Sequence, residues 1–127
     1  KIDIRKKVYF PHSLGVFYTS ITQFLGFPNY GDEYKVMGLA PYGQAKFIEE
    51  MKKIVLLQSN GGFKLNLKYF DHTQKHIPVK WNGGSPVLGK HYSEALKDLL
   101  AHNKRHPLSA ITGDSISKSM KVLFIFP

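Results

Sequence analysis

The sequence has 127 residues, a length that suits one domain or part of a larger one, and its 43% of hydrophobic residues allow a packed core. Eighteen lysines and arginines against nine aspartates and glutamates give a formal net charge of +9. The absence of cysteine excludes a disulfide scaffold, a cysteine nucleophile and cysteine-ligated metal sites, and fits a reducing compartment, so we expect a cytoplasmic protein.

Both ends of the sequence look like cuts within a longer protein. The first residue is Lys1 rather than methionine, and residues 122–127 form an apolar tail that needs a partner surface. No stretch approaches the roughly 18 to 20 apolar residues that cross a bilayer, so no membrane partner is expected. We therefore expect residues 1–127 to form a single partial domain, with an aberrant tail over 122–127.

The N-terminal part predicts a short strand followed by an amphipathic helix. The strand is expected over residues 6–10 and ends at Pro11. Ser13 suits the N-cap of a helix, because its hydroxyl can accept from the free N–H groups of the first turn. Gly26 is expected to end this helix as a C′ glycine. The apolar residues between them recur at the spacing of one helix face: Leu14, Phe17, Tyr18, Ile21, Phe24 and Leu25.

Two helices and a hairpin are predicted in the middle of the chain. After a turn, residues 33–40 predict a short helix, and residues 44–55 predict a second one with apolar residues along one side. Residues 55–58 and 63–67 then predict a β-hairpin, because the Asn-Gly pair between them is a strong turn signal.

The C-terminal part predicts a loop over 71–90 and a helix over 92–100, with Ser93 as its cap. Residues 102–107 form a basic connector, and residues 116–126 are ambiguous between helix and strand. The expected fold is therefore mixed α/β, helix-rich, with one short strand and one β-hairpin. Such a small number of strands cannot make a large sheet, so the lone strand needs neighbours from elsewhere.

Two pairs of histidines stand four residues apart, the spacing at which helical residues face one side and can bind zinc or iron. The pairs are His72 with His76 and His102 with His106, and Asp71 can add an oxygen ligand to the first. Prolines close to both pairs argue against helices there. We therefore expect surface histidines in loops and predict no metal ligand.

Glycines mark two further segments. Residues 81–86 contain a glycine pair that can approach an anion, but no established phosphate-loop pattern, so an ordinary loop explains them better. Residues 31–43 hold three glycines, one proline, two acidic residues and one lysine, and so many glycines favour close backbone approach to a ligand. Within this second segment, Glu33 and Lys35 stand two residues apart and would diverge on a helix.

Three segments closely resemble the NodU/CmcH family of carbamoyltransferases: residues 11–15, residues 23–27 and, above all, residues 31–43. The resemblance continues more weakly through residues 63–70 to Arg105. It implies an interior segment of the N-terminal half of such an enzyme, a half of the actin-like ATPase type, so that this chain is an incomplete fragment of that domain. The family transfers a carbamoyl group from carbamoyl phosphate, through a carbamoyl-adenylate made with ATP, to a hydroxyl-bearing small molecule.

The resemblance also implies roles for single residues. Lys35 can neutralise a phosphate or a developing oxyanion, and Glu33 can orient Lys35 or a hydroxyl, so both are expected to be catalytic. The nucleotide is expected near the start and end of the first helix, at His12, Ser13, Gly15 and Gly26. ATP and a divalent metal are expected as cofactors of the complete enzyme, and this fragment is not expected to bind either of them fully. The remainder of the enzyme chain is expected as a partner.

Two alternatives come from other classes of protein. The positive charge fits a small basic nucleic-acid-binding module, although scattered lysines are more often a solvated surface, so nucleic acid is not the expected partner. Seven tyrosines and nine phenylalanines can form a stacking platform for single strands, but most of them fall on inward helix faces. The second alternative is a segment that binds a partner chain and carries no chemistry.

Overall fold

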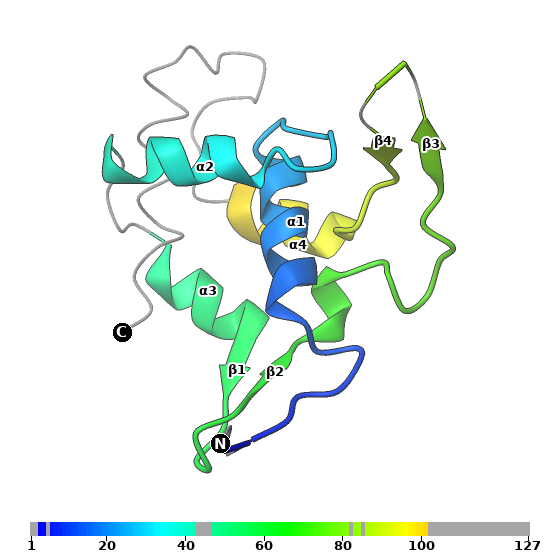
Figure 1. Ribbon diagram of the computed structural model, residues 1–127. Coiled ribbons are helices and arrows are strands. Elements are labelled where there is room, and N and C mark those ends of the chain that lie inside the picture. Colours follow the sequence, from blue (N-terminus) through cyan, green and yellow to red (C-terminus); the bar gives the residue numbers. More distant parts are fainter. Residues whose placement is uncertain (1–2, 5, 43–46, 82, 85, 102–127) are drawn as a thin grey trace.

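The computed structural model describes residues 3–4, 6–42, 47–81, 83–84 and 86–101 (Figure 1). Within them lie four α-helices and two small antiparallel sheets, so the mixed α/β expectation is confirmed. The predicted connector, the ambiguous segment and the apolar tail lie outside the described residues. In chain order the elements are α1 (Leu14–Phe24), α2 (Glu33–Leu39), the 3-10 turn η1 (Ala40–Tyr42), α3 (Ile48–Ile54), β1 (Val55–Leu57), β2 (Phe63–Leu65), the 3-10 turn η2 (Leu67–Tyr69), β3 (Val79–Trp81), β4 (Pro86–Leu88) and α4 (Glu94–Ala101).

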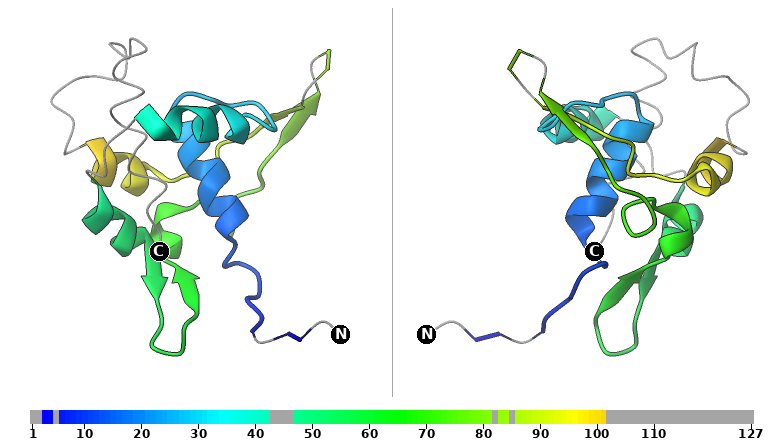
Figure 2. Two further views of the ribbon diagram at one scale, coloured as in Figure 1. Left: turned by 60° about the vertical axis from the view of Figure 1, so that its left-hand side comes forward. Right: turned by 90° about the vertical axis from the view of Figure 1, so that its right-hand side faces the viewer.

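Helix α1 runs through the middle of the fold, and the other helices pack around it (Figures 1 and 2). It begins where the sequence predicts, because the Ser13 hydroxyl accepts from the backbone N–H of Val16 at 3.4 Å. Its predicted apolar face is buried at Phe17, Ile21 and Phe24. This helix therefore lies at the centre of the packing described below.

The predicted helices that follow are present but short. α2 corresponds to the helix predicted over residues 33–40 and is continued by η1. α3 corresponds to the described part of the helix predicted over residues 44–55. Their inward residues, Val36 and Met51, are buried. Glu49 and Glu50 lie in the first turn of α3 and Lys52 in its last turn, an order that suits the helix dipole.

The predicted hairpin is confirmed as β1 paired with β2, in the register Val55 opposite Leu65. Gly61 in its turn has a φ of 77°, a conformation that glycine adopts without strain. Val55 and Leu65 are buried against the helices, whereas Leu57 near the turn is exposed.

Two predictions about strands are wrong. Residues 6–10 form no strand, because they pair with no described strand although the β1–β2 hairpin lies close by, and Tyr9 and Phe10 are exposed. The predicted loop over 71–90 contains a second hairpin, β3 with β4. The glycines and proline near its tip led to the loop prediction, but Gly83 and Gly84 both have positive φ and form the turn of this hairpin.

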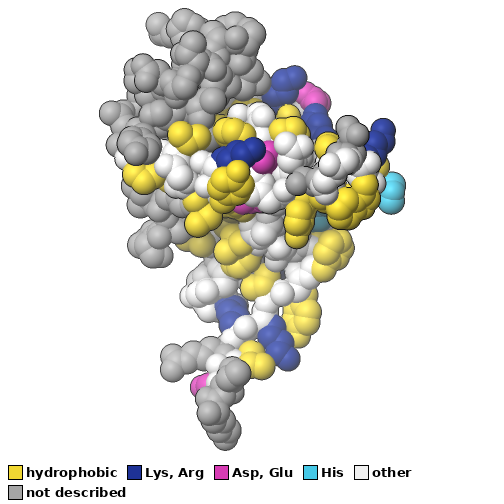
Figure 3. Space-filling model, turned by 45° about the horizontal axis from the view of Figure 1, so that its top comes forward, with side chains coloured by type: hydrophobic (Ala, Val, Ile, Leu, Met, Phe, Trp, Pro, Cys, Tyr) yellow, Lys and Arg dark blue, Asp and Glu magenta, His cyan; other side chains and the backbone are white. Residues whose placement is uncertain are grey.

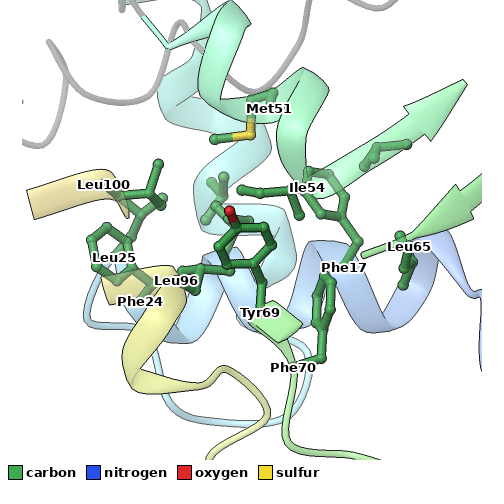
Figure 4. Packing of buried hydrophobic residues seen from close by; sticks show 13 residues of the cluster. Phe17, Phe24, Leu25, Met51, Ile54, Leu65, Tyr69, Phe70, Leu96 and Leu100 are labelled. Atoms are coloured by element: carbon green, nitrogen blue, oxygen red, sulfur yellow. The ribbon is translucent and has the colours of Figure 1, made fainter. Parts of the chain in front are cut away.

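The core lies where α1, α3, α4 and η2 meet (Figure 4). Leu96 and Leu100 of α4 face it, together with Tyr69 and Phe70 from η2 and its end. Each such side chain contributes about 1.5–3 kcal/mol by leaving water. In the part of the chain that the structure describes, no helix is long and apolar enough to cross a membrane.

Candidate functional site

The start of α1 holds three of the residues expected near a nucleotide. The Ser13 hydroxyl is occupied by its capping bond to the helix. The ring Nδ1 of His12 accepts from the backbone N–H of Leu65 at 3.2 Å, which ties the start of α1 to β2. Gly15 is exposed in the first turn, and a Cβ there would lie 3.3 Å from the Ser13 hydroxyl oxygen. The structure therefore brings these three residues together.

Gly26 lies at the opposite end of α1 and is separated from them. The 11 residues of the helix span roughly 16 Å. At Gly26 the chain turns with a φ of 97°, its N–H donates to the Gln23 carbonyl, and the next N–H, of Phe27, donates to the Thr22 carbonyl. These bonds form a Schellman motif, so the position of Gly26 is explained by the end of the helix.

Lys35 is held by a buried carboxylate. Its Nζ lies 2.5 Å from Asp32 Oδ1, and the Asp32 side chain is only 6% exposed. The other oxygen, Asp32 Oδ2, accepts from the backbone N–H of Asn29 at 3.0 Å. The Lys35 ammonium also lies 5.8 Å from the ring centres of Phe27 and Tyr34. The hydrogen bond to Asp32 and its charge raise the pKa of Lys35 above the ordinary value, so this group stays protonated.

Glu33 faces a different element from Lys35. Its Oε1 accepts from the Thr19 hydroxyl of α1 at 2.6 Å. Burial, helped by the Glu33 charge, raises the pKa of Tyr18 on the same helix to about 12. The expected divergence of Glu33 and Lys35 is thus observed, and Asp32 rather than Glu33 orients the lysine.

Partly buried hydrogen bonds join Gln23 of α1 to the segment before α4. The Gln23 side chain of α1 donates to the Gly89 carbonyl at 3.0 Å and accepts from the His91 N–H at 2.9 Å. Burial lowers the pKa of His91, although its hydrogen bond with the Gly89 carbonyl and the charge of Glu33 oppose that shift. His91 is therefore neutral near pH 7 and can act as a hydrogen-bond donor and acceptor.

Asp32 and Thr19 are functional candidates that the sequence interpretation did not single out. Asp32 stands three residues before Lys35, the spacing of neighbours on one helix face, and this spacing was the available signal. Thr19 gave no comparable signal, because its contact with Glu33 depends on how α1 and α2 pack.

The surface around Lys35 is largely apolar. Tyr30, Tyr34 and Met37 are all exposed by 60% or more. Figure 3 shows hydrophobic side chains gathered over the face that carries α2 and the β3–β4 hairpin, around a small group of charged ones. Such a charged group among exposed rings suits a ligand or partner that carries both apolar and anionic parts.

The described residues contain no group of three histidines, aspartates or glutamates placed to hold a metal ion. His72 lies in a turn rather than a helix, and its Nε2 is 3.0 Å from the Pro11 carbonyl oxygen. Its ring packs edge-on against Phe10 and Phe70. His72 therefore fixes the chain before α1, while His76 is exposed and the second histidine pair lies outside the described residues.

Comparison with known proteins identifies related sequences. A family model described as the carbamoyltransferase N-terminus matches residues 1–105. The uncharacterized protein sll1178 of Synechocystis is 35% identical over 107 residues, which are 84% of this chain and 15% of that protein. The nodulation protein NolNO of Sinorhizobium fredii is 35% identical over 121 residues, covering 87% of this chain and 17% of its own length. The nodulation protein NolO of Bradyrhizobium diazoefficiens is 34% identical over 113 residues, covering 81% and 20%.

No solved structure matches the chain. The chain spans a fifth or less of the length of these curated relatives.

Proposed function

The chain belongs to the carbamoyltransferase family, within the N-terminal part of such proteins, and from this premise we propose that it is a fragment of an O-carbamoyltransferase. In the proposed reaction a hydroxyl oxygen of a small molecule attacks the carbonyl carbon of a carbamoyl-adenylate. The new C–O bond forms, the bond from that carbon to the phosphate oxygen breaks, and AMP leaves. The hydroxyl proton goes to a base.

Carbamoyl phosphate and ATP are the proposed sources of the adenylate. The remainder of the enzyme chain is the proposed partner, since relatives are at least five times as long as the segment they share with this chain. The cytoplasm is the proposed location, because a cysteine-free chain fits a reducing compartment.

The observation that carries the proposal is the Asp32–Lys35 pair. Asp32 fixes the position of the Lys35 ammonium and keeps it protonated, so the remaining N–H donors of the ammonium can hydrogen-bond a carbonyl or phosphate oxygen on which negative charge develops. Lys35 remains 37% exposed in its side chain, so a substrate can reach it. We assign Lys35 the binding of the phosphate or the oxyanion, with Asp32 as its support.

Glu33 is proposed to orient a hydroxyl group. Its carboxylate already accepts from one hydroxyl, that of Thr19, and its second oxygen can accept from another. A carboxylate in this position can also receive the proton of the attacking hydroxyl. The two charged groups thus have separate tasks, which agrees with their separate directions in the structure.

The nucleotide is proposed to lie at the start of α1, near His12, Ser13 and Gly15. Free N–H groups at the start of a helix favour an anion. Gly26 lies at the opposite end of α1 from His12, Ser13 and Gly15. It is therefore proposed only to lie near another part of the nucleotide, if the bound ligand extends along the helix.

A divalent metal belongs to the proposed complete enzyme, but the described residues do not fit one. They offer no group of three suitable ligands, and His72 is occupied by the chain before α1. Any metal ligands are therefore expected outside them, and no step proposed here depends on a metal.

The test is a pair of substitutions in a full-length relative, at the positions that match Lys35 and Lys52. Lys52 is the control because it pairs with Glu49 on the exposed side of α3. Lys35→Ala is expected to lower kcat by about 100-fold, the effect typical of losing one oxyanion donor. Lys52→Ala is expected to leave it unchanged, and equal activities would remove Lys35 from the site.

A further inference from the structure

A hollow of about 180 Å³ lies between the chain before α1 and the β1–β2 hairpin. Its walls come from residues 6–12 on one side and 58–64 on the other, two stretches far apart in the sequence. None of the lining residues is acidic. A space of this volume holds several water molecules, which suits a small organic anion.

Three of the lining residues are lysines: Lys6, Lys7 and Lys64. Among the described residues, none of the three has an ion pair with a carboxylate, whereas Lys35 and Lys52 do. Within the described part of the chain, no carboxylate therefore pairs with the three lysines that line the hollow. A dianion placed there would interact favourably with all three.

The Lys6 ammonium is fixed at the edge of the hollow by the hairpin turn. Its Nζ donates to the Asn60 carbonyl at 2.7 Å and to Asn60 Oδ1 at 2.6 Å. A Cβ at position 62 would lie 2.6 Å from this Nζ, so Gly62 gives the ammonium its room. Two of the three N–H donors of Lys6 are thus used by Asn60, and the third remains for a ligand.

His12 supplies a further donor. Its Nδ1 accepts the backbone N–H of Leu65, so the proton of the neutral ring sits on Nε2. The ring is one of the walls of the hollow and is held in place by this bond.

Aromatic rings complete the walls. Tyr9, Phe10 and Phe63 all line the hollow, and Tyr9 and Phe10 expose most of their surface. Rings beside ammonium groups suit a ligand with a planar body and a strong negative charge. A phosphate monoester carries about −1.5 to −2 charges at pH 7 and so uses three lysines better than a carboxylate does.

We propose that this hollow binds a small phosphate monoester with a planar body, the phosphate between Lys6, Lys7 and Lys64 and the planar part against the aromatic rings. The hollow shares His12 with the proposed nucleotide position but contains neither Asp32 nor Lys35, and the proposal does not depend on carbamoyl transfer. Binding is a property of the described chain, so it is measured without any enzyme assay.

The test is an NMR titration of the ¹⁵N-labelled 127-residue chain with phenyl phosphate, inorganic phosphate and phenol. Phenyl phosphate is expected to shift the amide signals of Gly62, Phe63 and Lys64 in a saturable way. It should bind at least about tenfold more tightly than inorganic phosphate, since stacking on a ring adds roughly 1–3 kcal/mol. Phenol is expected to give no saturable shift, because it lacks the charge.

Matched variants separate this site from general attraction to a basic protein. Lys64→Gln removes a charge from an exposed strand position and should weaken phenyl phosphate about fivefold or more, whereas Lys52→Gln on α3 should leave the affinity unchanged. The unchanged pattern of other amide signals shows that each variant is folded. Equal weakening by both variants, shifts spread over all lysines, or no saturation would each overturn the proposal.

Discussion

The Asp32 carboxylate holds the Lys35 ammonium in place and keeps it charged. Because the carboxylate is buried and also accepts from the Asn29 N–H, it cannot turn away from the lysine without losing a second hydrogen bond. A folded-state pKa above the ordinary value means that this pair stabilises the fold fully below the ordinary lysine pKa. That contribution is lost as the pH rises through the folded pKa of Lys35.

Asp32→Asn is expected to return the pKa of Lys35 toward its ordinary value, because the amide keeps the shape of the side chain but not its charge. The measurement is an NMR titration of the Lys35 side chain in both proteins. Glu49→Gln serves as the control, since it alters a similar pair with Lys52 on the exposed surface. An unchanged Lys35 titration in Asp32→Asn would show that Asp32 does not set its charge.

Tyr18 provides a second titration. Its pKa of about 12 lies above the ordinary value of 10, so the neutral phenol stabilises the fold fully below pH 10 and this contribution is lost between pH 10 and 12. Glu33→Gln is expected to lower the pKa of Tyr18, because the negative charge of Glu33 is the second cause of the shift after burial. Absorbance titration near 295 nm, with Tyr18→Phe to identify the signal, measures the difference.

At the scale of elements, the ends of α1 are determined by local chemistry that the sequence displays. Ser13 and Gly26 mark its beginning and end, and the apolar spacing between them predicts its buried face. The prediction of a strand over 6–10 was wrong because a strand forms only by pairing with another strand, and the local sequence does not show whether such a partner is present. The Asp32–Lys35 pair could have been predicted from the sequence, because residues at i and i+3 are neighbours on a helix. The contact from Thr19 to Glu33 could not, because it depends on how two helices pack.

Two glycines allow a direct test of this account of the helix ends. Gly26→Ala should destabilise the fold by about 1 kcal/mol, because alanine is strained at a φ of 97°. Gly38→Ala should stabilise it by about 0.5–1 kcal/mol, because Gly38 lies within α2, has no positive φ, and its added Cβ would meet nothing within 4 Å. Urea unfolding of the chain measures both, and changes of the same sign would contradict the account.

At the scale of the whole molecule, the 127-residue chain alone is expected not to catalyse carbamoyl transfer. The proposed reaction would need ATP, carbamoyl phosphate and the hydroxyl acceptor held together, and proximity would supply much of its rate. The chain corresponds to a fifth or less of its curated relatives, so most of the residues that would hold these groups are expected elsewhere. An assay for the carbamoylated product tests this, and turnover by the chain alone would overturn the fragment interpretation.

The nucleic-acid alternative leads to a separate prediction. Several lysines are already paired with carboxylates on different elements: Lys35, Lys52, Lys75, Lys90 and Lys97. Such pairing reduces the charge available to phosphates, so no tight binding to DNA or RNA is expected. A titration with a single-stranded oligonucleotide at 50 mM and 200 mM salt, as rough reference conditions, checks this, because real phosphate contacts give a steep salt dependence. Strong, salt-sensitive binding would favour the alternative.

The two hairpins form separate two-stranded sheets, and within the described residues neither has a third strand. Every one of these strands therefore has one side whose backbone N–H and C=O groups are not bonded within its sheet. Unprotected strand edges pair readily with the edges of other molecules. The outer edges of β2 and β4 are partly covered, by the bond from the Leu65 N–H to His12 and by the bridge between Val87 and Asn29. During purification of the chain at high concentration, self-association is therefore expected through β1 or β3, whose outer amides should exchange with deuterium much faster than those of α1.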